Sequence, residues 1–94
     1  MASPMTDIHS DLAIPPGEFL AEEIEARGMT QGQLAEKMGR PRQVINGIIR
    51  GHRAITAETA LQLEGVLGLS AQLWMNLESE YRLVLARNAG AKSA

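Results

Sequence analysis

The sequence contains no cysteine, and only three of its 94 residues are aromatic: Phe19, Trp74 and Tyr81. The absence of cysteine excludes a disulfide framework, a thiolate metal site and a cysteine nucleophile. Leucine, isoleucine, alanine and methionine must supply most of the core, which favours helices over sheets. A domain this short buries a small fraction of its surface, so dimerisation would add stability.

The sequence also lacks long apolar segments and clusters of residues typical of a catalytic site. No apolar run approaches the ~20 residues that span a bilayer, and the N-terminus lacks the pattern of a signal peptide. Neither His9 nor His52 has a carboxylate or nucleophile at an interpretable spacing, and no phosphate-binding glycine loop is present. We therefore expect a cytoplasmic protein without membrane contact, metal, cofactor or enzymatic activity.

Apolar periodicity and cap residues predict five helices, at 17–27, 31–38, 41–50, 57–67 and 71–87. Thr30 and Gln33 form a capping box before the second of these helices. Four glycines occupy positions that favour a left-handed helix cap: Gly28, Gly39, Gly51 and Gly68. No segment alternates with a period of two, so the fold class is all-α.

The chain ends lack such periodicity. We expect residues 1–14 to form a flexible N-terminal arm, and residues 89–94 to form a disordered tail. The ordered domain then spans residues 15–88.

The positive charge is concentrated in one stretch of the chain. Five of the nine lysines and arginines lie between Lys37 and Arg53, with no acidic residue among them, although the formal net charge is −2. Such arginines can simply solvate a surface helix. A basic patch is also the feature by which a protein attracts phosphate groups.

The segment 41–50 separates into two faces when it is placed on a helix at ~100° per residue. One face is apolar and consists of Pro41, Val44, Ile45, Ile48 and Ile49. The other is polar and consists of Arg42, Gln43, Asn46, Gly47 and Arg50. Because Arg, Gln and Asn make bidentate contacts to guanine and adenine edges, we predict that Arg42, Gln43 and Asn46 read DNA bases. The bare surface at Gly47 would let the helix approach DNA closely.

The segment 31–38 supplies the first half of a helix-turn-helix, and Gly39 supplies the turn. The motif resembles the lambda-repressor-like (Cro/cI-type) DNA-binding family through Leu34, Ala35, Met38, Gly39, Ile45 and Ile48. Arg40 departs from the family, which usually has an aliphatic residue after the turn glycine. We expect its side chain either to point outward or to snorkel toward solvent, where it could contact a phosphate.

Basic side chains around the motif are predicted to hold the DNA backbone: Lys37, Arg40, Arg50 and Arg53. The resemblance adds Gln31, since the family places a backbone contact at the start of this helix. A dimer would set two copies of helix 41–50 in successive major grooves of a palindromic operator, ~34–36 Å apart.

Three longer segments are similar to HigA-type antitoxins, also called addiction-module antidote proteins. They are IPPGEFLAEEIEARGMTQGQLAEKMG, GHRAITAETALQLEGVLG and SAQLWMNLESEYRL, and the similarity covers roughly residues 14 to 87. The most specific parts are PPGEFL and SAQLWMNLE. The resemblance implies a five-helix lambda-repressor-like domain over 15–88, with the helix-turn-helix at about 31–50 and a C-terminal dimerisation helix at 71–87.

The same resemblance implies a homodimer that represses its own operon and neutralises a RelE-like toxin, a basic ribosome-dependent mRNA endonuclease. A broad apolar face of helix 71–87 consists of Trp74, Leu77, Tyr81, Val84 and Leu85. It could cover only the core of the monomer, but we favour a subunit interface because the core is small. An acidic stripe of Glu18, Glu22 and Glu25 on the first helix is a possible contact for a basic toxin. Such a stripe is more commonly a solvated helix face.

Two other functions stay open. The chain could be a stand-alone Cro/cI-type regulator without a toxin, which a short basic reading frame beside its gene would argue against. It could also be a helix-turn-helix protein-interaction module that no longer reads DNA, for which Arg40, Pro41 and Gly47 leave room. Alanine substitution of Arg42 and Asn46 distinguishes a DNA-binding protein from such an interaction module, because these substitutions weaken DNA binding only if this face of the helix contacts DNA.

Overall fold

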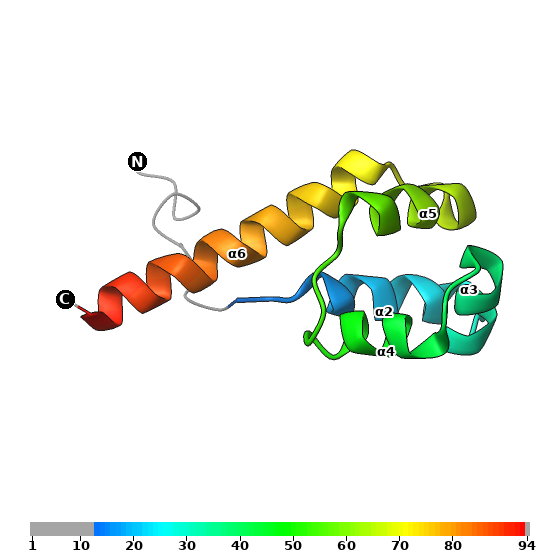
Figure 1. Ribbon diagram of the computed structural model, residues 1–94, viewed down its shortest axis with the longest axis horizontal. Coiled ribbons are helices and arrows are strands. Elements are labelled where there is room, and N and C mark those ends of the chain that lie inside the picture. Colours follow the sequence, from blue (N-terminus) through cyan, green and yellow to red (C-terminus); the bar gives the residue numbers. More distant parts are fainter. Residues whose placement is uncertain (1–12, 94) are drawn as a thin grey trace, which may run out of the picture.

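The computed structural model describes residues 13–93, and over this range it contains helices and no strand. The elements are α2 (Pro16–Ala26), α3 (Gln31–Met38), α4 (Arg42–Ile49), α5 (Ala57–Leu67) and α6 (Ala71–Ser93), as shown in Figure 1. The predicted all-α class is confirmed. Most of the arm predicted over 1–14 lies outside the described residues.

Local capping sets most helix boundaries. The Thr30 hydroxyl accepts a hydrogen bond from the Gln33 backbone N–H at 3.0 Å, and the Gln33 side chain accepts one from the Thr30 N–H at 2.9 Å. This is the predicted capping box at the start of α3. Thr56 caps α5 by accepting from the Thr59 N–H. The four glycines predicted to have left-handed backbone all have positive φ: Gly28, Gly39, Gly51 and Gly68.

α2 is shifted by one residue from the predicted 17–27, and α4 and α6 differ from the predicted 41–50 and 71–87. Pro41 caps α4 with an extended backbone instead of forming its first turn, so that α4 begins at Arg42. α6 continues to Ser93, past the predicted end at 87, and includes most of the segment 89–94 for which a disordered tail was expected. The cause is local, because no proline interrupts this segment and alanines at 86, 89 and 91 favour helix.

The core lies where the five helices meet. Its buried apolar residues are Leu20, Ile24, Leu34, Ala35, Met38, Val44, Ile45, Ile48, Ile55, Ala60, Leu63, Leu67 and Trp74. Trp74 is fully buried, and its ring lies 5.3 Å from that of Phe19, centroid to centroid, at 58°. Tilted aromatic pairs of this kind add stability beyond the area that they bury. The first turns of α6 are thereby fixed to α2.

The start of α2 crosses the end of α4 at backbone contact. A Cβ atom on Gly17 would lie 1.9 Å from the carbonyl oxygen of Ile48 and 2.6 Å from the Cα of Ile49. Only glycine permits this approach, because any side chain would overlap the α4 backbone. Gly17 therefore fixes the position of α4 against the rest of the domain.

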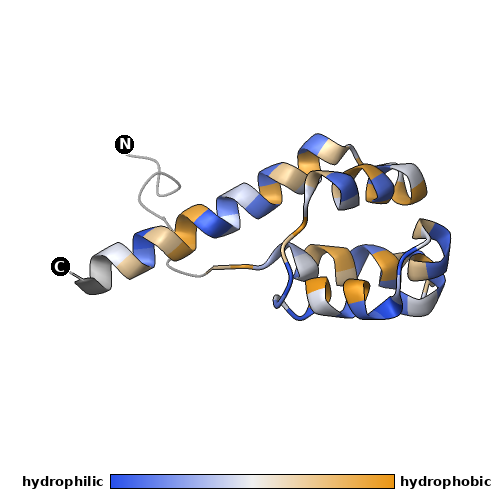
Figure 2. Ribbon diagram, in the orientation of Figure 1, coloured by the Kyte–Doolittle hydropathy of each residue, from blue (hydrophilic) through white to orange (hydrophobic). Residues whose placement is uncertain are grey.

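The C-terminal half of α6 extends away from the other helices (Figure 1). Hydrophobic and hydrophilic residues alternate irregularly along it (Figure 2). Within residues 13–93, no helix combines the length and the apolar composition that crossing a membrane requires.

Candidate nucleic-acid interface

Backbone hydrogen bonds close the turn between α3 and α4. Gly39 has a φ of 69°, and its N–H donates to the carbonyl of Glu36 at 3.1 Å. The next N–H, that of Arg40, donates to the carbonyl of Ala35 at 3.0 Å. Glycine is favoured at this left-handed position because it has no Cβ to crowd the backbone. The left-handed cap thus ends α3 and turns the chain toward α4.

α4 turns its apolar side to the core and its polar side outward. Val44, Ile45 and Ile48 are buried. On the other side, the structure leaves Arg42, Gln43 and Arg50 exposed and Asn46 and Gly47 half-buried. The predicted division of this helix is confirmed at Val44, Ile45 and Ile48, whereas Pro41, which was assigned to the apolar face, is exposed.

The positive charges around α4 form no ion pair with any other part of residues 13–93. Lys37 and Arg53 are exposed and lie close to α4 in the sequence, one before it and one after it. Together with the polar residues of α4 they form a set that we call the basic face: Lys37, Arg42, Gln43, Asn46, Arg50 and Arg53. Over residues 13–93, the ion pairs join Arg27 to Glu23 and Arg82 to Glu78, and none involves the basic face. Its charge is available for an external anion such as phosphate.

Two residues with separate predicted roles are joined by a hydrogen bond. The Asn46 side-chain N–H donates to the Gln31 side-chain carbonyl at 3.1 Å. Gln31 is the first residue of α3, and Asn46 lies in the middle of α4. The predicted base reader and the predicted backbone contact are thus in direct contact.

Gly47 is covered by a neighbouring side chain, contrary to the expected bare surface. A Cβ atom placed on Gly47 would lie 3.2 Å from the Cβ and 3.6 Å from the Cδ of Arg53. The aliphatic part of Arg53 therefore packs against α4 at this glycine. This contact holds the base of an exposed arginine against the recognition helix, while leaving its guanidinium free to reach a phosphate.

Arg40 points back into the protein, which corrects the expected outward orientation. Its guanidinium donates to the side-chain oxygen of Gln62 at 2.9 Å and to the hydroxyl of Thr59 at 3.4 Å. Both acceptors lie on the same side of α5, three residues apart. An aliphatic residue at this position would make only apolar contacts. Arg40 instead joins the turn between α3 and α4 to α5 by hydrogen bonds.

The residues predicted to form the dimer interface fall into two groups. Trp74 is completely buried among core residues, so it cannot contact a second subunit, and its assignment to the interface is wrong. The other four reach the surface of α6: Leu77, Tyr81 and Val84 are half-buried and Leu85 is 37% exposed. The broad apolar face of α6 thus serves the core at its start and is accessible farther along.

The acidic stripe lies on the surface of α2. Glu18, Glu22 and Glu25 are all exposed. Two of them, Glu22 and Glu25, line an open groove between α2, α3 and α4 whose apolar lining includes Ile24, Met29 and Ile49. The structure thus shows a groove beside the acidic stripe, which the sequence pattern did not indicate.

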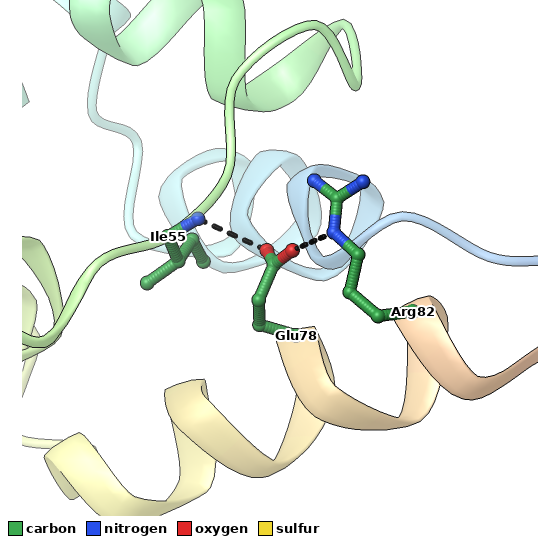
Figure 3. A network of polar contacts seen from close by, with 3 residues as sticks. All are labelled: Ile55, Glu78 and Arg82. Atoms are coloured by element: carbon green, nitrogen blue, oxygen red, sulfur yellow. Dashed lines mark hydrogen bonds and ion pairs between the residues drawn. The ribbon is translucent and has the colours of Figure 1, made fainter. Parts of the chain in front are cut away.

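A buried carboxylate links α6 to the segment between α4 and α5, and no sequence motif pointed to it. Glu78 is 7% exposed. It accepts the backbone N–H of Ile55 at 2.9 Å and pairs with the Nε of Arg82 at 2.6 Å (Figure 3). Glu78 and Arg82 are four residues apart, a spacing at which opposite charges pair on one side of a helix, so the sequence can indicate this contact. The contact with Ile55 joins residues 23 apart, so local patterns do not reveal it.

In the described part of the chain, no three histidine, aspartate or glutamate side chains gather as metal ligands. His52 is exposed in the turn after α4. His9 lies outside the described residues.

Comparison with known proteins identifies the family. Residues 20–74 match the helix-turn-helix family. The chain is 41% identical over 75 residues to virulence-associated protein I of Dichelobacter nodosus, covering 79% of this chain and 69% of that protein. It is 36% identical over 73 residues to antitoxin HigA-1 of Vibrio cholerae, covering 77% and 69% of the two chains.

A solved structure extends the likeness to three dimensions. The antitoxin HigA of Pseudomonas aeruginosa, solved with the higBA promoter, superposes with a TM-score of 0.82 at 36% identity. The match covers 87% of this chain and 90% of that one. The expected absence of enzymatic activity agrees with a family of DNA-binding regulators. The chain belongs to the helix-turn-helix family and, within it, to the HigA-type antitoxins.

Proposed function

We propose that this chain binds its own operator DNA and represses transcription through the basic face. The observation that carries the proposal is the recognition helix itself, where the exposed Arg42 and Gln43 and the half-buried Asn46 lie on a side whose positive charges form no ion pair within residues 13–93. The Pseudomonas aeruginosa HigA solved with its promoter supports the same role for a protein of this fold. Arg42, Gln43 and Asn46 read bases.

Backbone contacts come from the residues around them. Lys37, Arg50 and Arg53 neutralise phosphates, and Gln31 donates to a phosphate at the start of α3. Arg40 has further N–H donors beyond those used by Gln62 and Thr59, but its main effect is to hold the turn that carries α4. Acidic residues elsewhere limit attraction to unrelated polyanions.

Alanine substitution on the recognition helix tests the DNA-binding role. Arg42→Ala and Asn46→Ala should each weaken a mobility shift of the DNA upstream of the gene, by about 1–3 kcal/mol per lost base contact. Arg87→Ala is the matched control, because Arg87 is an exposed arginine on α6 remote from α4 in sequence. If all three variants bound like the wild type, α4 would not be the reading helix.

We further propose a homodimer formed through the accessible part of α6. Leu77, Tyr81, Val84 and Leu85 supply its apolar contact, and the small core of a 94-residue chain gives association a clear benefit. Two α4 helices then bind a palindromic site with half-sites ~34–36 Å apart. Sedimentation equilibrium should show a dimer for the wild type and a folded monomer for Leu85→Glu. A monomeric wild type would contradict this assembly.

The third part of the proposal is neutralisation of a RelE-like toxin. Kinship with the HigA-type antitoxins supports it, and the exposed Glu18, Glu22 and Glu25 offer a surface of suitable sign for a basic partner. Co-purification with the product of a neighbouring short basic reading frame tests it. Glu22→Lys with Glu25→Lys should reduce capture while leaving DNA binding intact. Absence of any captured partner would instead favour a stand-alone regulator.

A further inference from the structure

Resting on the proposed function, we infer that Glu78 sets the half-site spacing that the dimer accepts in its operator. Glu78 is 7% exposed and is the last buried residue of α6 before its C-terminal half, since none of the residues 79–90 is buried. The part of α6 beyond it carries Tyr81, Val84 and Leu85 of the proposed dimer contact. Glu78 therefore lies between the core of the domain and the helical arm through which two subunits associate.

Both oxygens of the Glu78 carboxylate are engaged. Oε1 accepts the backbone N–H of Ile55 at 2.9 Å, and Oε2 pairs with the Nε of Arg82 at 2.6 Å (Figure 3). Because Arg82 lies one turn farther along the same helix, the ion pair orients the carboxylate without joining α6 to another element. The bond to Ile55 is the one that attaches α6 to the segment between α4 and α5.

The segment 50–55 is in turn bound to the end of α4. The backbone N–H of His52 donates to the carbonyl of Gly47 at 2.8 Å, and the aliphatic part of Arg53 packs on α4 at the same glycine. Ile55, at the end of this segment, is 2% exposed in the core. A displacement of α6 relative to Ile55 is therefore a displacement of the dimer arm relative to the recognition helix.

The start of α6 has a separate anchor. Trp74 is fully buried, and its ring lies 5.3 Å from that of Phe19, which belongs to α2. Trp74 and Glu78 are about one helical turn apart. Trp74 fixes the position of α6, and the second anchor at Glu78 fixes the direction in which its C-terminal half leaves the domain (Figure 1).

This direction matters because small tilts become large displacements at the second half-site. Over the ~34–36 Å between two α4 helices, a tilt of about 6° moves the second helix by about 3.4 Å, the rise of one base pair. Base contacts cannot supply this selectivity, since each α4 reads its own half-site. Glu78 is thus a positioning residue for the spacing of the operator.

Two successive selections measure the spacing without knowledge of the operator. Duplexes of randomised sequence first define the half-site that the wild type enriches. A second library then carries two inverted copies of this half-site, with spacers that vary over about one helical turn of 10 base pairs. Spacer frequencies would be determined for the wild type, Glu78→Met, Glu78→Gln and Glu80→Ala. Fluorescence anisotropy on a duplex with a single half-site measures base reading alone.

Glu78→Met keeps the length of the side chain and removes the acceptor for the Ile55 N–H. We expect its preference for the best spacer over the neighbouring ones to fall by roughly 2- to 10-fold, the equivalent of one hydrogen bond. Its affinity for the single half-site should equal that of the wild type. A loss of stability alone would weaken binding to one and to two half-sites alike, so it does not produce this result.

The other variants separate the hydrogen bond from the charge and from folding. Glu78→Gln retains a carbonyl acceptor for Ile55 and should keep the wild-type preference. Glu80→Ala is the control, because Glu80 is exposed two residues away on the same helix. Glu78→Met would also be made together with Gly65→Ala, a substitution within α5 that meets no other residue and supports folding.

The outcomes are distinct. An unchanged spacer preference in Glu78→Met would overturn the inference. Loss of the preference in Glu78→Gln would also overturn it, because the charge would then be responsible instead of the bond to Ile55. A wild type that bound its half-sites equally well at every spacing would overturn it too, while leaving DNA reading intact. If the wild type enriched no half-site, the proposed function itself would fail.

Discussion

The carboxylate of Glu78 accepts a hydrogen bond from the backbone N–H of Ile55 at 2.9 Å, in a buried setting. Ile55 lies between α4, which carries the proposed base-reading residues, and α5, while Glu78 lies on α6 (Figure 3). The projecting helix is thereby fixed to the segment that follows α4. In a dimer formed through α6, this contact would help to set the separation of the two α4 helices.

Removing the Glu78 carboxylate should destabilise the protein. Glu78→Ala leaves the Ile55 N–H buried without an acceptor, at a cost of about 1–3 kcal/mol. Glu78→Gln should cost less, because its side-chain carbonyl can still accept from Ile55. Urea unfolding followed by circular dichroism measures both, and Glu80→Ala, at an exposed position two residues away, is the control. Equal stability of Glu78→Ala and Glu80→Ala would show that the contact adds nothing.

Alanine substitution of two glycines, one at the crossing of α2 and α4 and one within α5, should have opposite effects on stability. Gly17→Ala should destabilise the fold by about 1–3 kcal/mol or more, since the new methyl group overlaps the Ile48 carbonyl. Gly65→Ala should stabilise it by up to about 1 kcal/mol, because Gly65 lies within α5 and its Cβ would meet no other residue. Thermal unfolding of the two variants and the wild type measures both changes in stability. A Gly17→Ala variant as stable as Gly65→Ala would contradict the close crossing.

Arg40 and Arg42 should behave differently although they are two residues apart. Arg40→Ala removes the hydrogen bonds to Gln62 and Thr59, which should cost about 1 kcal/mol of stability. Arg42→Ala should leave stability nearly unchanged and weaken operator binding, because Arg42 is exposed and reads DNA in this account. Urea unfolding and anisotropy on both variants make the comparison. The reverse pattern would refute these roles.

The packing of Arg53 on Gly47 predicts a coupled effect on DNA binding. Gly47→Ala brings a methyl group to 3.2 Å from the Arg53 Cβ, so the arginine must shift while the helix gains propensity. We expect a protein at least as stable as the wild type that binds DNA more weakly.

A double-mutant cycle tests whether Gly47 acts through Arg53. In an Arg53→Ala background, Gly47→Ala should have little further effect on DNA affinity. A full additional loss would mean that the new methyl group itself obstructs the DNA.

Local chemistry made much of this fold readable from the sequence. The capping box of Thr30 and Gln33 and the left-handed Gly39 depend on residues at most five apart, so their structure follows from short patterns. The two faces of α4 were equally predictable, since the period of the helix assigns each residue to a side. The end of α6 is not predictable in this way, because the segment after 87 has only a weak apolar period although its alanines sustain a helix.

Contacts between distant residues were beyond the reach of such patterns. The sequence shows a broad apolar face on α6, but only the folded packing shows that Trp74 belongs to the core and Leu85 to the surface. Arg40 was expected to face solvent because its acceptor Gln62 lies 22 residues away. The bond between Gln31 and Asn46 joins residues 15 apart, so local patterns do not reveal it either, although the sequence predicts DNA contacts for both.

Sequence-specific DNA binding by α4 is the central claim, and fluorescence anisotropy on DNA from upstream of the gene tests it most directly. The titration compares that duplex with a scrambled one of equal composition over a series of salt concentrations. We expect a preference of ~10³-fold or more for the upstream duplex, with affinity falling steeply as salt rises. Equal and weak binding to both duplexes would contradict the account of this protein as a repressor of its own operon.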